Sequence, residues 1–191
     1  MDFLVYKISE LPTELALVDI LPAQERAESL RRKGHYAATR VLLRQEISRR
    51  THTIAKEIEI SYGEHGKPEC SLQPFNISHS GDCLCLAFHH KAIGVDVEYM
   101  KERNFAALAS RFMSPEQLAA FMGRQCPLHE FYACWCAAEA IIKHAGDTIW
   151  HAPGYPFLYQ QGRIKCLFEN APVVELFTPM PGYCGAVAYT P

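Results

Sequence analysis

The chain has 191 residues and a formal net charge of −2, with 49% hydrophobic and 21% charged residues, so it can fill the core of one large domain or two small ones. It has no apolar run near the ~20 residues that span a bilayer, and its N-terminus lacks the apolar stretch of a secretory signal. Eight cysteines without such a signal predict reduced thiols and a cytoplasmic protein without membrane contact.

The first half of the chain is predicted to contain a long helix followed by antiparallel strands. Leu30, Ala37, Val41 and Leu42 recur at helical spacing, which predicts one helix over about residues 23–50. Glycine and proline turns separate the strands expected after it, which lie in IEISY, in the hairpin PFNISHSGDCLCLAFHH and in AIGVDVEYM.

The second half repeats this order of elements. Ser114 and Pro115 are typical of a helix start, and a longer helix is predicted from about Leu128 to Ala145, before Gly146. Three strands are expected after it, in GYPFLYQQGRIKCLF, APVVELF and GYCGAVAYT. We therefore predict an α+β fold with two similar halves, residues 1–93 and 94–191, each a long helix packed on a small antiparallel sheet.

The strand IGVDVEY carries two acids separated by one valine. Asp96 and Glu98 point to one face of an extended strand, and Val95 and Val97 to the other. Two adjacent carboxylates repel each other, so this face is either open to solvent or contains a bound cation.

The predicted second helix carries Trp135, Glu139 and Lys143 on one face. Their spacing also suits a surface ion pair worth a few tenths of a kcal/mol. The residues around them are small or apolar on nearly every side of this helix, which favours burial and a further partner for the Glu139–Lys143 pair.

Basic groups are concentrated in the first half. Residues 24–51 contain eight basic and three acidic side chains, a pattern typical of a solvated helix face or of an anion site.

Ser78 and His79 are adjacent and face opposite sides of a strand, so they cannot form a simple nucleophile–base pair. His79 is either structural or a phosphate donor. Two half-sites emerge: carboxylates suited to Mg²⁺ on Asp96, Glu98 and Glu139, and phosphate donors on Arg40, Lys67, His79 and Lys143.

Six segments of the chain together resemble the Sfp-type 4′-phosphopantetheinyl transferase family. They occur in the family's order and at fitting spacings, from the basic helix to the end of the chain: GKP (66–68), FNISHSGD (75–82), GVDVE (94–98), FMSPE (112–116), WCAAEAIIK (135–143) and PGYCGAVAY (181–189).

The resemblance implies a pseudo-dimer fold that binds coenzyme A between its halves. The implied reaction moves 4′-phosphopantetheine from coenzyme A to a serine of an apo acyl or peptidyl carrier protein and releases 3′,5′-ADP. Such carriers serve fatty acid, polyketide or nonribosomal peptide biosynthesis. An internal pseudo-dimer needs no second subunit, so we expect a monomer.

The family motifs also imply roles for individual residues. Asp96, Glu98 and Glu139 are expected to bind Mg²⁺ (Mn²⁺ is the other option), and Glu139 to accept the serine proton. The residues expected to bind coenzyme A are Arg40, Lys67, Pro68, Ser78, His79 and Lys143. Of these, His79 and Lys143 are expected to contact its phosphates during catalysis.

One position departs from the family pattern. The family has lysine before the helical glutamate, where this chain has Ala138. Loss of one such charge near the phosphates costs on the order of 3 kcal/mol of transition-state stabilisation unless another base, Lys143 or one from the first helix, replaces it. The alternative function is therefore a weakly active or non-catalytic domain that binds coenzyme A or a carrier protein.

A nucleic-acid surface on the basic helix is disfavoured, because the net charge is balanced and that helix lacks interleaved aromatic residues.

Overall fold

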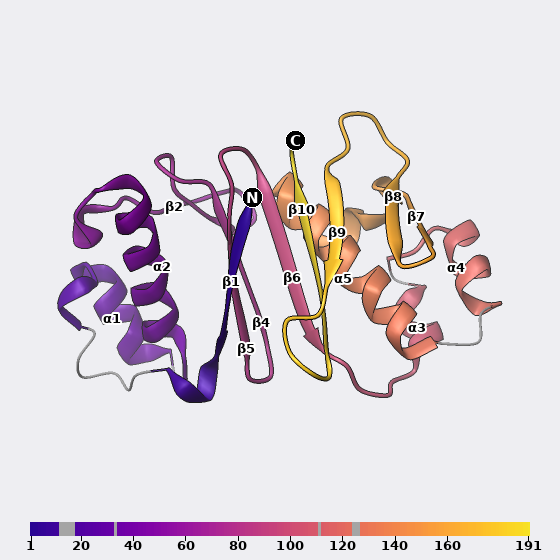
Figure 1. Ribbon diagram of the computed structural model, residues 1–191, viewed down its shortest axis with the longest axis horizontal. Helices are drawn as coiled ribbons and strands as arrows, with labels where there is room; N and C mark the ends of the chain where they lie inside the picture. The colour runs from indigo at the N-terminus through magenta and orange to yellow at the C-terminus, as the bar shows by residue number, and fades with distance from the viewer. Residues whose placement is uncertain (12–17, 33, 111, 124–126) are drawn as a thin grey trace.

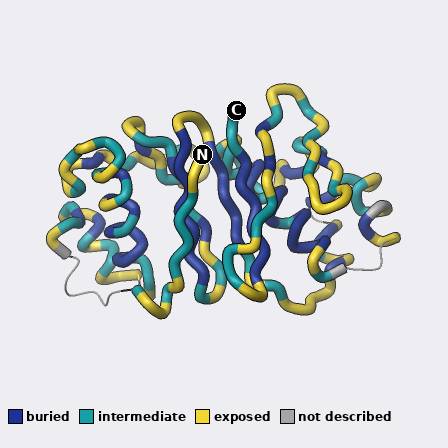
Figure 2. The backbone as a smooth tube through the Cα atoms, viewed as in Figure 1, coloured by how far each residue is buried: buried dark blue, intermediate teal, exposed yellow. Residues whose placement is uncertain are grey.

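The computed structural model describes residues 1–11, 18–32, 34–110, 112–123 and 127–191. Its central feature is a pair of three-stranded sheets packed face to face, with one long helix on each outer side (Figure 1). The layers follow the order helix, sheet, sheet, helix. Figure 2 shows that burial is concentrated in the central strands and on the inner sides of the long helices.

The first sheet has the antiparallel order β1–β5–β4. Its strands are β1 (Asp2–Lys7), β4 (Phe75–Ser80) and β5 (Cys83–Phe88). Leu84, Leu86 and Phe88 of the central strand face Leu43 and Ile47 of helix α2 (Tyr36–Thr51). Alternate residues of β5 therefore bury one face of this sheet against a helix.

The second sheet has the antiparallel order β6–β10–β9. Its strands are β6 (Ile93–Tyr99), β9 (Val173–Phe177) and β10 (Tyr183–Tyr189), and helix α5 (Pro127–Ala145) covers its outer face. Both sheets use the same connection order: a first strand, a long helix, then a hairpin whose last strand lies in the middle. The chain passes from one sheet to the other between residues 88 and 93. The division into halves at residues 93 and 94 stays a prediction.

Between the sheets lies an apolar layer in which β5 packs against β6. Cys83, Cys85 and Ala87 of β5 meet Val95 and Val97 of β6. The valines that alternate with Asp96 and Glu98 are thus buried between the sheets, as the period of two requires.

The remaining elements lie around this framework. They are α1 (Ala23–Arg31), β2 (Ser61–Tyr62), β3 (Pro68–Glu69), α3 (Phe105–Ala109), α4 (Pro115–Met122), β7 (Phe157–Gln160), β8 (Arg163–Cys166), and 3-10 helices at Ile8–Glu10, Val18–Ile20, Ala55–Glu57 and Ile149–Gly154. In the described part of the chain, no helix combines the length and apolar character needed to cross a membrane.

Most predicted elements are confirmed, including α5, the β4–β5 hairpin and β6. Helix α4 begins with the predicted Ser114 cap, which forms a reciprocal capping box with Gln117. The single helix predicted over residues 23–50 is wrong. It is two helices, because the backbone leaves helical geometry at Arg32 and Gly34 has a φ of 90°, and Leu30 is 89% exposed.

Two strand predictions also need correction. Strand β1 is not predicted from the sequence, although it forms an edge of the first sheet. The segment GYPFLYQQGRIKCLF is not one strand but the hairpin β7–β8, whose turn places Gln161 and Gly162 at positive φ.

Helix α5 crosses β6 in direct backbone contact at Gly94. A Cβ atom at this position would overlap the carbonyl oxygen of Ala140 and the amide nitrogen of His144. Only glycine permits this approach, which fixes the helix along the strand and brings Glu139 and Lys143 over Asp96.

Candidate active site

The candidate site lies along the open edge where β4 and β6 run beside each other. Strand β6 pairs with β10 on one side only, so its other edge has unpaired amide groups. Three short polar side chains of β4 satisfy them. Asn76 accepts from the amide of Val95 at 2.8 Å, Ser78 from Val97 at 3.2 Å and Ser80 from Tyr99 at 3.1 Å. We call this row of contacts the seam.

Asp96 lies at the centre of the seam and is 5% exposed. Its Oδ1 accepts hydrogen bonds from Ser78 Oγ at 2.8 Å and from Lys143 Nζ at 2.6 Å. Lys143 also donates to the carbonyl oxygen of Val95 at 3.3 Å. Burial lowers the pKa of Lys143, but the neighbouring Asp96 outweighs it, and the net shift is upward. Within the described residues, Lys143 pairs with Asp96 and not with Glu139.

The second oxygen of Asp96, Oδ2, is buried without a hydrogen-bond partner among the described residues. A buried carboxylate oxygen normally has a partner, so this atom is suited to a ligand. Glu98 accepts a hydrogen bond from Ser80 at 2.6 Å. Burial raises the pKa of Glu139; Lys143 opposes this rise, and the charges of Asp96 and Glu98 add to it.

This donor set fits a hard divalent cation. Asp96 offers a free buried oxygen, and Glu139 would shed its like-charge repulsion if a cation bound between the acids. Among the described residues the three carboxylates do not form a ready-made metal cluster, since Lys143 is the cation that contacts Asp96. The side chains would need to rearrange locally for metal binding.

Lys67 ties the two halves together at one end of the seam. Its ammonium donates to the carbonyl oxygens of Ile93, at 3.3 Å, and of Lys143. Burial lowers its pKa. A cavity of about 340 Å³ adjoins it, with walls from both halves: Ser61, Lys67, Glu69, Cys70, Ser71, Pro74, Phe75, Ala92, Ile93, His144, Ala145 and Gly146. Its size falls in the range of small-molecule sites. Pro68 pairs with Tyr62 in the β2–β3 hairpin just outside this lining.

His79 projects from the opposite face of β4 to Ser78, as the strand geometry predicts. Its ring lies against that of His35, with centroids 4.5 Å apart and planes at 73°. The pKa of His79 is lowered, first by partial burial and then by His35 and Lys143, while Asp96 opposes these effects. The sequence does not predict the contact between His35 and His79, because His35 reaches His79 only through tertiary packing.

Arg40 lies in a different environment. It is buried in the first half, where its guanidinium donates to Glu25 and, at 3.2 Å, to the Tyr62 hydroxyl. None of its described hydrogen bonds reaches the seam. A phosphate contact by Arg40 stays a prediction, and it would require Arg40 to release Glu25.

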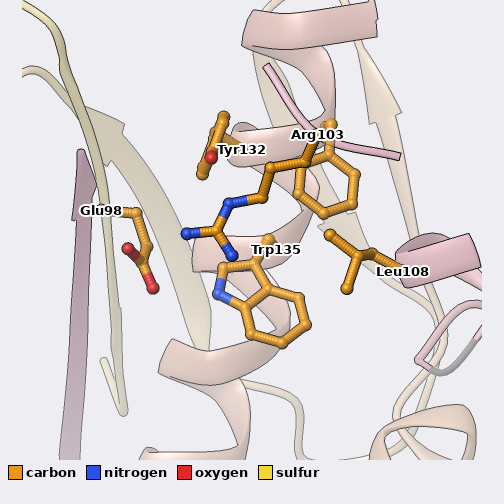
Figure 3. A pocket seen from close by; sticks show the side chains of 6 residues that line it. Glu98, Arg103, Leu108, Tyr132 and Trp135 are labelled. Carbon is orange, nitrogen blue, oxygen red and sulfur yellow. The ribbon is translucent and has the colours of Figure 1, made fainter. Parts of the chain in front are cut away.

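A small aromatic pocket lies at the other end of the seam. Figure 3 shows the guanidinium of Arg103 between Tyr132 and Trp135, extending toward Glu98; Leu108 and Phe131 complete the walls. The Tyr132 hydroxyl accepts from the Lys101 amide and donates to the Lys101 carbonyl, which fixes the loop that carries Arg103. Trp135 is one helical turn from Glu139, so this pocket adjoins the carboxylates. Arg103 was also missed by the sequence analysis.

Comparison with known proteins assigns the family. A sequence profile of the 4′-phosphopantetheinyl transferase superfamily matches residues 92–163, which contain all three carboxylates. The 4′-phosphopantetheinyl transferase AcpT of Escherichia coli O157:H7 is 31% identical over 169 residues, 83% of this chain and 82% of that protein. The chain belongs to the 4′-phosphopantetheinyl transferase superfamily.

Two further relatives agree with this membership. The 4′-phosphopantetheinyl transferase Sfp of Bacillus subtilis is 34% identical over 158 residues, 77% of this chain and 70% of that protein. A Haemophilus influenzae relative is 40% identical over 80 residues, covering 39% of this chain and 34% of its own length. The α+β architecture of this transferase is consistent with its superfamily.

Proposed function

We propose that this transferase is of the Sfp type and moves 4′-phosphopantetheine from coenzyme A to a serine of an apo carrier protein, with Mg²⁺ as cofactor. The observation that carries the proposal is the buried Oδ2 of Asp96, which has no hydrogen-bond partner in the described part of the chain and lies near Glu98 and Glu139. An unsatisfied carboxylate oxygen among like charges is costly unless a cation uses it.

In the proposed mechanism, the chain's own groups bind the substrate and move the proton. The serine hydroxyl attacks the phosphorus that carries pantetheine, a new P–O bond forms, and the bond to 3′,5′-ADP breaks. Glu139 accepts the serine proton, a role that its raised pKa suits. Lys143 binds the diphosphate, and Mg²⁺ on Asp96, Glu98 and Glu139 supplies Lewis-acid stabilisation of the same charge when bound.

The two ends of the seam suit the two parts of this reaction. The cavity beside Lys67 is proposed to bind the adenylate portion of coenzyme A. The pocket beside Trp135 opens next to Glu98, where the acceptor serine must approach. We propose a monomer of two pseudo-equivalent halves that acts in the cytoplasm on acyl or peptidyl carriers of fatty acid, polyketide or nonribosomal peptide biosynthesis.

The test is a mass-shift assay with apo carrier proteins, coenzyme A and Mg²⁺. The wild-type protein should add the phosphopantetheine mass to at least one carrier. Asp96→Ala and Glu139→Ala should abolish the addition while their circular dichroism stays unchanged. Glu175→Ala is the matched control, because Glu175 is an exposed acid on β9 that bonds Tyr189, away from the seam. Full activity in Asp96→Ala would overturn the site assignment.

Ala138 favours a second candidate, a domain that binds coenzyme A or a carrier protein with little turnover. Ala138 is 3% exposed in the core of the second half. Lysine at this position would therefore overpack a buried site, at a cost of about 1–3 kcal/mol. Restoring the family lysine is thus a compromised test, because lost stability would mask a gain in activity.

Arg103 offers a sharper test of the same question. Its guanidinium extends toward Glu98 and is placed to supply the positive charge absent at position 138. If so, Arg103→Gln should lower the transfer rate at least about tenfold, and Arg103→Lys should retain much of it. If the wild-type protein binds coenzyme A with Mg²⁺ but modifies no apo carrier, the binding-domain function replaces the enzyme.

A further inference from the structure

Two histidine rings form a pair that the proposed mechanism leaves only partly used. His79 lies at the solvent-exposed edge of β4, and His35 comes directly before α2. With ring centroids 4.5 Å apart, nitrogen atoms of both rings can reach oxygens of one phosphate group. Among the described residues, neither ring forms a hydrogen bond within the protein.

The surroundings of the pair favour an anion. Helix α2 has 16 residues, no side-chain cap at His35 and no acidic residue in its first turn. The Tyr36 hydroxyl at its start donates to Glu28 of α1 at 2.7 Å, and Arg32 donates to the same carboxylate at 3.1 Å. Lys143 of α5 adds positive charge, and Asp96 of β6 opposes it. These are the charged groups that act on His79 from the elements packed around it.

We propose that His35 and His79 bind the same phosphate group of coenzyme A, each as a protonated imidazolium. This inference rests on the proposed function and deepens it: it assigns His35 to substrate binding and makes affinity depend on protonation of the pair. Two adjacent imidazoliums without a ligand would repel each other, and an anionic phosphate group between them removes that repulsion. Binding should therefore take up protons and weaken as the pH rises.

The test is isothermal titration calorimetry of coenzyme A and dephospho-coenzyme A at about pH 6 and about pH 8. We expect wild-type affinity for coenzyme A to fall about tenfold or more over this range. His35→Ala should weaken binding mainly at the lower pH. His35→Gln, which keeps hydrogen-bond donors but cannot be protonated, should lose most of the pH dependence, and His35→Lys should retain affinity at both values.

The control is His90→Ala, which removes an exposed histidine of a different ring pair. It should leave the affinity for both ligands at the wild-type value at each pH. If dephospho-coenzyme A lacks the pH dependence, the 3′-phosphate is the group bound; if it keeps the dependence, the diphosphate is bound. Either result supports the pair.

The proposal is overturned if His35→Ala and His35→Gln bind coenzyme A like the wild-type protein at both pH values. In that case the mass-shift assay can still succeed, so the proposed function survives. If the wild-type protein binds coenzyme A at neither pH, even with Mg²⁺, the proposed function fails together with the inference.

Discussion

Glu25 and Asp96 are both buried acids that contact basic side chains, but their hydrogen-bonding states differ. Glu25 accepts from Arg40 Nε at 3.1 Å, from Arg44 Nε at 2.8 Å and from Nη2 groups of both arginines, so both its oxygens have partners. Arg44 is satisfied further by the carbonyl oxygens of Ala55 and Ile58. Asp96 accepts hydrogen bonds through one oxygen, and its other oxygen has no partner among the residues that the structure describes.

This difference separates a structural cluster from a binding site. The Glu25 cluster holds α1, α2 and the following loop together and has no spare acceptor on its acid. At the seam, Asp96 has an oxygen without a partner among the described residues, and the raised pKa of Glu139 shows that its negative charge is poorly compensated. These carboxylates can therefore accept a further positive charge. Buried charge alone does not indicate function; unsatisfied buried charge does.

The largest expected effect on stability comes from Glu25→Gln. Removing this acid leaves two buried guanidinium groups without a counter-charge, which should lower the free energy of unfolding by about 3–5 kcal/mol. Urea denaturation measures it. Glu28→Gln removes a half-buried acid bonded to Arg32 and Tyr36. It is the control and should change the free energy of unfolding much less. A small change in the free energy of unfolding would contradict the structural role given to the Glu25 cluster.

The pH dependence of the free energy of unfolding provides a second test of the Glu25 cluster. Burial alone would raise the pKa of Glu25, but hydrogen bonds from Arg44 and Arg40 outweigh it and hold the pKa below its usual value. Its contribution to stability is therefore present above the unfolded pKa of about 4.3 and is lost as the pH falls through the folded pKa. Glu25→Gln should weaken this acid dependence.

Asp96→Asn should show the opposite profile, with a large loss of activity and little loss of stability. Without the carboxylate, transfer should fall about 10²–10³-fold. The unfolding free energy should change by about 1 kcal/mol, because Lys143 keeps 27% of its side chain exposed and has Glu139 near it. Thermal melts with and without Mg²⁺ should show that the variant has lost metal-dependent stabilisation. Retained stabilisation would place the cation elsewhere.

Gly94→Ala tests how the seam is positioned. Because the added methyl overlaps the backbone of α5, the helix must shift, at a cost of about 1–3 kcal/mol. Activity should fall about tenfold or more as Glu139 and Lys143 move from Asp96. Gly154→Ala, where an added Cβ meets nothing within 4 Å, is the control. Equal activity in both variants would show that the helix position is not critical.

The smallest effect is expected from Glu139→Gln in the absence of Mg²⁺. An acid with a raised folded pKa destabilises the protein as the pH rises above its unfolded value. The variant should therefore be slightly more stable than the wild-type protein at about pH 8, by less than about 1 kcal/mol, and equal to it at about pH 4. Thermal melts at both pH values measure this. A variant less stable than the wild-type protein at the higher pH would contradict the conclusion that burial and the charges of Asp96 and Glu98 destabilise ionised Glu139.

Local sequence patterns predict much of the fold, and the metal-binding role that they predict for the three carboxylates stays a prediction. The alternation in IGVDVEY predicts β6 and the shared face of Asp96 and Glu98, and α5 follows from an alanine-rich segment that ends at a glycine. Hydrophobic spacing cannot show the break before α2, because Leu30 fits the helical pattern and yet is exposed.

Long-range contacts account for what the sequence does not predict. The burial of Arg40 depends on Glu25 in another helix, and His35 reaches His79 only when α2 packs on the first sheet. The polar alternation of Asn76, Ser78 and Ser80 is visible in FNISHS, but its meaning depends on the neighbouring amides of β6. Charge and burial can be judged only once these partners are known.

The side chains of β4 at the seam have one more consequence, which concerns association between molecules. An unpaired strand edge can template a strand from another chain and so start aggregation. Asn76, Ser78 and Ser80 use the free amides of β6 and offer no continuous backbone ladder in return. The edge of β6 at which we propose substrate binding is thereby closed to an incoming β-strand.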